Sequence, residues 1–210
     1  MPSSRAGFPG LGRPSCICGI TWRPTRTRGE CRASFRLRCS RAGWLHVRAM
    51  QFTCSICGVE HTDLPHIGSA APSHWADELA KDTSSLLTAD VCIIEGRDFF
   101  VHGVIEIPVH DYKHEFGWGV WVSHKKENYE TYRERFDTAD VGPFFGWLCT
   151  AINYYPESTL GLKTMAHYRG GGLRPRIVLE ESQHPLYRQQ RNGISLSEAW
   201  KIVHHYEGKP

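Results

Sequence analysis

The chain has 210 residues, of which 40% are hydrophobic and 22% are charged, with a formal net charge of +3. This composition is typical of a folded globular domain and excludes a chain that is disordered throughout. No stretch reaches the roughly 18 apolar residues of a membrane-spanning helix, and residues 1–10 lack the apolar run of a secretory signal, so we expect a cytoplasmic protein without a membrane partner.

Charge is divided unevenly along the chain. Residues 1–49 hold ten arginines and one acidic residue, a net charge of +9, whereas the remaining residues hold 15 basic and 21 acidic side chains, a net charge of −6. The first segment shows no apolar period, so we predict a disordered, Arg-rich extension. Three interpretations stay open: it binds nucleic acid, it is an organelle transit peptide, or it is foreign to a natural protein that starts at Met50.

Residues 50–210 show the alternation of a single folded domain. The patterns predict strands at 89–95, 99–109, 116–122, 160–168 and 176–181, and helices at 125–136, 185–193 and from 195 onward. Ser73 is expected to cap a further short helix, and Ser195 with Glu198 has the spacing of a capping box. We therefore predict an α+β fold, with a mostly antiparallel sheet of about five strands and helices packed on one face.

The sharpest local motif is the Cys54-x-x-Cys57 pair near the start of this domain. Two thiolates at this spacing can bind one Zn²⁺ from a tight turn, and His61 is close enough in sequence to be a third ligand. A fourth ligand would have to come from elsewhere, for example Cys92 or Cys149. We therefore expect a zinc knuckle; a redox pair and two ordinary reduced cysteines are the alternatives.

Aromatic residues cluster between positions 118 and 155. On a regular strand, Trp118 and Trp121 point to opposite faces, so one can fill the core while the other lines a groove. Trp147 belongs to the same cluster, and we add His184 as a further candidate ligand-binding residue. Core filling is the competing interpretation of all the aromatic side chains.

The domain also resembles a bacterial family known as domain of unknown function 2199. The resemblance covers about residues 52–205 and rests on several segments in order, including Phe52-Thr-Cys-Ser-Ile-Cys-Gly-Val-Glu-His61, Trp118-Gly-Val-Trp-Val-Ser123 and Phe144-Phe-Gly-Trp-Leu148. It implies a small bacterial, cytoplasmic protein. It implies no particular activity, substrate or catalytic residue.

No complete catalytic motif stands in the sequence. Our first expectation is therefore a non-enzymatic domain that binds a protein partner or small ligand and contains a structural zinc knuckle. A metal-dependent hydrolase is the alternative, and nucleic-acid binding through the basic N-terminal segment is the second alternative.

Overall fold

The computed structural model of the protein describes residues 52–53, 58, 60–61, 63–137 and 141–207. Three α-helices and a mixed eight-stranded sheet confirm the predicted α+β class. The strands are β1 (Phe52–Thr53), β2 (Glu60–His61), β3 (Ile67–Gly68), β4 (Leu86–Leu87), β5 (Val91–Ile94), β6 (Asp98–Ile107), β7 (Val109–His110), β8 (Phe116–His124), β9 (Phe144–Trp147), β10 (Lys163–His167), β11 (Arg176–Leu179) and β12 (Ile194–Ser195). The helices are α1 (Lys126–Glu134), α2 (Pro185–Asn192), α3 (Leu196–Glu207) and a 3₁₀ helix, η1 (Asp77–Lys81).

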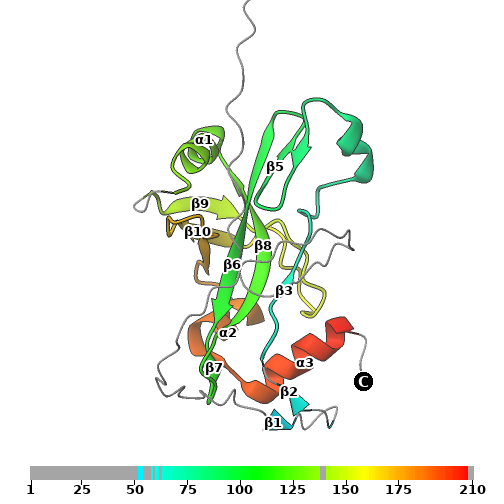
Figure 1. Ribbon diagram of the computed structural model, residues 1–210, viewed down its shortest axis with the longest axis vertical. Helices are drawn as coiled ribbons and strands as arrows, with labels where there is room; N and C mark the ends of the chain where they lie inside the picture. The colour runs from blue at the N-terminus through cyan, green and yellow to red at the C-terminus, as the bar shows by residue number, and fades with distance from the viewer. Residues whose placement is uncertain (1–51, 54–57, 59, 62, 138–140, 208–210) are drawn as a thin grey trace, which may run out of the picture. The chain divides into compact units, whose positions relative to one another are not determined.

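A long hairpin of β6 and β8 organises the sheet (Figure 1). The two strands pair antiparallel from Phe99 opposite His124 to Ile107 opposite Phe116. The other edge of β6 is shared: β5 pairs with its first half, and β11 runs parallel to it at Val104. Beyond β11 follow β10 and β9, both in antiparallel pairing.

The prediction of about five mostly antiparallel strands is wrong, both in the number of strands and in the direction of their pairing. The sheet has eight strands and is mixed, because β11 pairs parallel with β6 and β3 pairs parallel with β8. The additional strands β3 and β4 have two residues each, which is too short to show an alternating pattern. The parallel pairs join segments far apart in the chain, and local periodicity carries no information about such pairing.

The sheet curls until its last strand meets β8 again. Val122 forms a bridge to Leu148, and the Cys149 N–H donates to the Trp121 carbonyl at 2.8 Å. Gly146 allows this approach, because a Cβ atom there would lie 2.2 Å from the Ser123 carbonyl oxygen. The strands β8, β6, β11, β10 and β9 thus form a nearly closed ring.

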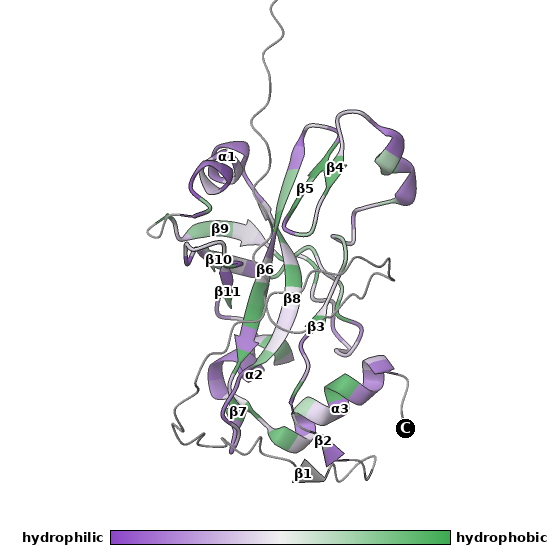
Figure 2. Ribbon diagram, in the orientation of Figure 1, coloured by the Kyte–Doolittle hydropathy of each residue, from purple (hydrophilic) through white to green (hydrophobic). Residues whose placement is uncertain are grey.

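The main core lies on the face of the hairpin that carries Ile105 and Val120, both fully buried. Helices α2 and α3 cover it with Leu186 and Trp200. Toward the other end of β6, α1 packs two tyrosines against Phe99 and Val101. Because α1 is hydrophilic along most of its length (Figure 2), these tyrosines provide its contact with the sheet.

The structure tests two predicted helix caps, at Ser195 and at Ser73, and confirms one of them. The capping box is confirmed at its first half, because the Glu198 N–H donates to Ser195 Oγ at 3.1 Å. The prediction that Ser73 caps a helix is wrong. Ser73 Oγ instead accepts the Ala151 N–H, and the next helical segment, η1, begins at Asp77.

Among the described residues, no helix combines the length and the apolar character needed to cross a membrane.

Candidate functional site

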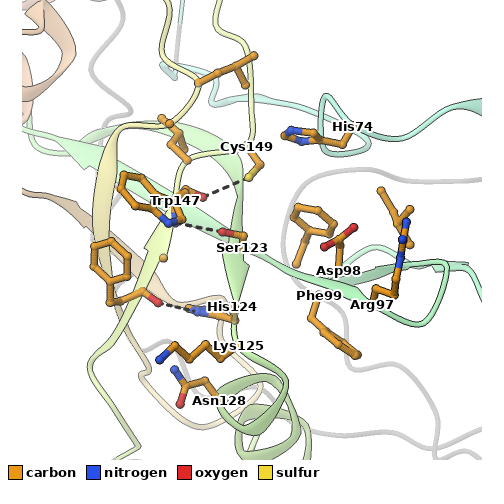
Figure 3. A pocket seen from close by; sticks show the side chains of 17 residues that line it. His74, Arg97, Asp98, Phe99, Ser123, His124, Lys125, Asn128, Trp147 and Cys149 are labelled. Atoms are coloured by element: carbon orange, nitrogen blue, oxygen red, sulfur yellow. Dashed lines mark hydrogen bonds between the residues drawn. The ribbon is translucent and has the colours of Figure 1, made fainter.

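An open groove of about 920 Å³ lies where the β5–β6 hairpin, the end of β8, strand β9 and the start of α1 meet. Figure 3 shows its lining, with Asp98 and Arg97 on the side of the β5–β6 hairpin and Trp147 across from them. Its volume falls within the range of about 300–1,000 Å³ that is usual for small-molecule sites.

One wall of the groove consists of exposed apolar side chains. Phe145 and Trp147 stand two residues apart on β9, so they share a face, and their rings meet edge to face at 5.2 Å. They are 39% and 45% exposed, and Leu160 beside them is 41% exposed. Large exposed apolar groups gathered around a concavity are typical of a binding surface.

The opposite wall and the floor are also largely apolar. His74 stacks on Phe100 with 5.9 Å between ring centroids, and both residues line the groove. On the floor, the Cys149 thiol donates to the Trp147 carbonyl at 3.3 Å. Burial raises the pKa of this thiol, so it stays protonated at neutral pH and is a poor nucleophile.

His124, which also lines the groove, has both ring nitrogens engaged. Nδ1 lies 3.2 Å from the Phe145 carbonyl oxygen, which can only accept, so Nδ1 carries the proton and donates. Nε2 then accepts from the Tyr168 hydroxyl at 2.8 Å. Burial lowers the pKa of His124 to about 4, so the ring is neutral at physiological pH.

Polar side chains occupy the α1 end of the groove. Lys125 precedes the first residue of α1 and Asn128 lies three residues later, which places both on one side of the helix start. On the hairpin wall, Arg97 forms an ion pair with Glu95, and Asp98 follows it in the chain.

Of the four predicted ligand-binding residues, the structure places only Trp147 at the groove. Trp118 and Trp121 point to opposite faces of β8, as predicted, and both are buried, at 2% and 0% exposure. Trp118 lies in the main core, whereas Trp121 stacks on His102 and donates its indole N–H to the Ser69 carbonyl at 3.0 Å. These two tryptophans therefore have structural contacts.

His184 is the residue before α2 and caps that helix. Its Nδ1 accepts the Leu186 N–H at 3.1 Å, so Nε2 carries the proton, which it donates to the Glu157 carbonyl at 3.2 Å. Both nitrogens are thus used in holding the start of α2.

The structure describes little of the three predicted metal ligands. Cys54 and Cys57 fall outside the described residues, and of His61 only the backbone is described, in β2. Strands β1 and β2 pair antiparallel, with Phe52 opposite His61 and Thr53 opposite Glu60. Within the described ranges, no group of three or more His, Cys, Asp or Glu side chains could hold a metal ion.

Sequence reasoning missed most of the groove. Part of its lining stands between β8 and α1, at Ser123, His124 and Lys125. Neither the alternation of the strand nor the apolar spacing of the helix marks these residues as a site. A usable signal was the pair Phe145 and Trp147, because two large aromatic residues flanking a glycine on a short strand place both rings on one face.

Comparison with known proteins identifies the family. A family model described as "Uncharacterized protein conserved in bacteria (DUF2199)" matches residues 53–194. The chain belongs to this family. The match confirms the family indicated by the sequence and includes every residue that lines the groove. No curated protein and no solved structure matches the chain.

Proposed function

We propose that this member of the DUF2199 family is a non-enzymatic binding domain, and that its groove takes a small ligand with a flat apolar body. The observation that carries the proposal is the exposed pair Phe145 and Trp147 on the wall of a groove of about 920 Å³. Burying two such rings against a ligand removes a large apolar area from water, and aromatic pairs add roughly 0.5–1.5 kcal/mol beyond that area.

The state of the titratable groups in the groove supports binding over catalysis. The Cys149 thiol has a raised pKa and its proton is directed to a backbone carbonyl. His124 has a lowered pKa, and both of its nitrogens are engaged. A nucleophile and its base need the opposite arrangement, with a thiol of lowered pKa and a ring nitrogen free to take its proton.

The proposal predicts that a neutral aromatic probe binds at β9. We expect 2-naphthalenemethanol to bind the full chain saturably in a ligand-observed NMR titration. Trp147→Ala should weaken this binding at least fivefold, because it removes the larger ring of the wall, in line with the loss of roughly 1 kcal/mol or more per aromatic contact.

Leu173→Ala is the matched control, since Leu173 is an exposed apolar residue, at 49%, that does not line the groove. It should bind the probe like the unaltered chain. Equal weakening in both variants, or none in Trp147→Ala, would contradict the proposal.

We further propose that Cys54, Cys57 and His61 hold a structural zinc ion. The β1–β2 pairing supports this, because it brings the backbone of His61 opposite Phe52, two residues before Cys54. Thiolate and imidazole are the ligands that structural zinc prefers, and such sites contribute directly to folding.

Metal analysis tests the zinc proposal. We expect about one zinc per purified full chain by mass spectrometry, and its loss in Cys54→Ser together with a lower melting temperature. Cys39→Ser is the control, because Cys39 lies outside the family match and is not a candidate zinc ligand, so it should leave the zinc content unchanged. A chain purified without zinc, or a Cys54→Ser chain that keeps it, would contradict the zinc knuckle.

A further inference from the structure

We infer that the ligand of the groove is a small organic acid: an apolar ring system that carries one carboxylate, which binds Lys125 and Asn128 at the start of α1. This inference rests on the proposed function and adds the charge and the orientation of the ligand. It follows from three features of the groove, namely one available ammonium group, hydrogen-bond donors beside it, and a net positive charge of the lining.

The ammonium group of Lys125 is available for a ligand. Among the residues that the structure describes, Lys125 takes part in no ion pair, whereas its neighbour Lys126 is 3.8 Å from Glu130 and Arg97 is paired with Glu95. The side chain lines the groove, as Figure 3 shows together with that of Asn128. A cation at the rim of an apolar groove attracts an anion more strongly than it would in open solvent.

Hydrogen-bond donors surround this position. Asn128 lines the groove and its amide offers two N–H donors. Lys125 gives α1 no side-chain cap, since an ammonium group cannot accept the N–H groups of the first turn. The start of the helix therefore adds a favourable field for negative charge to that of the lysine.

The charged side chains that line the groove are Arg97, Asp98 and Lys125, which gives the lining a net positive charge. His124, the residue before Lys125, is neutral because burial lowers its pKa. Ser123 is uncharged, and its hydroxyl oxygen accepts the backbone N–H of Trp147 at 3.2 Å. The acidic side chain of the lining, Asp98, lies beside Phe99, which pairs with His124, so it is on the strand next to Lys125. Glu127, in the first turn of α1, does not line the groove. With one unpaired lysine at this end, the geometry favours a single carboxylate.

The orientation of the ligand follows from these positions. With its carboxylate at Lys125, the apolar body extends along β9 over Phe145 and Trp147, since these side chains line the same groove. Figure 3 shows Lys125 and Asn128 below His124, and Trp147 on the far side of that ring. Lys125 thus sets the charge preference, and Trp147 sets the affinity for the ring.

Three probes of matched size test the inference on the full chain: 2-naphthoate, 2-naphthalenemethanol and 2-naphthylmethylammonium. We expect the dissociation constant of naphthoate to be about five- to tenfold lower than that of the alcohol at low salt, and that of the ammonium probe to be higher than either. In Lys125→Gln the advantage of naphthoate over the alcohol should vanish while the alcohol binds as before. Lys113→Gln, which alters an exposed lysine outside the groove, should keep the full preference.

The outcomes separate the two proposals. If no probe binds, the groove is not a ligand site and the proposed function fails. If the probes bind with equal affinity, or if the ammonium probe binds best, the groove is a ligand site but the inference of a carboxylate is overturned. A preference for naphthoate that persists in Lys125→Gln overturns the role of Lys125.

Discussion

The imidazole of His124 lies buried between the Tyr168 hydroxyl and the Phe145 carbonyl, and this places one titratable group at the seam between β8 and β9. Its pKa in the folded protein is about 4, below the ordinary value of 6.5. The unfolded chain therefore binds a proton that the folded chain excludes between these two values. The resulting stability is present above pH 6.5 and is lost as the pH falls toward 4.

We predict that this residue makes stability depend on pH. A difference of about 2.5 in pKa corresponds to a total on the order of 3 kcal/mol, of which about 2 kcal/mol should be lost between pH 7 and pH 5. Urea unfolding at the two values measures the loss. His124→Gln keeps a donor and an acceptor but does not titrate, so its loss over the same range should be smaller by about that amount.

His102 is a second buried histidine with a lowered pKa in the described part of the chain, and it remains in both proteins, so its effect cancels from the comparison. His74→Gln, at an exposed position, is the control and should leave the pH profile of the unaltered chain in place. Parallel pH profiles for the unaltered chain and His124→Gln would contradict the neutral, buried state of the ring.

At the scale of elements, the return of β9 to β8 positions the site, because it brings Phe145 and Trp147 beside the β5–β6 hairpin. Gly146 stands at the closest point. A methyl group there would lie 2.2 Å from the Ser123 carbonyl oxygen and 2.4 Å from Val122 Cγ1, and neither is the end of a flexible side chain.

Gly146→Ala should therefore destabilise the protein by about 2 kcal/mol or more, which is the usual cost of adding a methyl group to a filled contact. Chemical unfolding at neutral pH measures it. Gly68→Ala is the matched control on β3, where the nearest atom to the new methyl group is 3.9 Å away, and it should change stability by less than about 0.5 kcal/mol. If the two variants were equally stable, β9 would not be held against β8 as described.

Elements with a strong local signal could be predicted from the sequence, and their partners could not. Alternation predicted the strands β6 and β8, and the tyrosine spacing predicted α1, to within a few residues of their observed ends. The parallel pairing of β11 with β6 depends on the path of the intervening chain. The groove was missed for the same reason, since its walls come from residues between 74 and 161 that only the closure of the sheet brings together.

At the scale of the whole molecule, the concentration of positive charge and the family match lie in different parts of the chain. The family match spans residues 53–194 and contains both the groove and the Cys-x-x-Cys motif. Residues 1–49, with a net charge of +9, lie outside the match and outside the described residues, so nucleic-acid binding through them stays a prediction. The proposed ligand site lies entirely within residues 50–210, which have a net charge of −6. The positive charge of Lys125 at the groove is therefore opposite in sign to the net charge of this part of the chain.

The central claim is that the groove at β9 is the ligand site of the domain. Backbone amide shifts of the isotope-labelled full chain during a titration with 2-naphthalenemethanol test it most directly. We predict saturable shifts at residues 123–128 and 145–149, and none in α3. Shifts centred instead on the smaller cavity of about 360 Å³ beside Tyr187 and Gln190, or no saturable shifts at all, would contradict the claim.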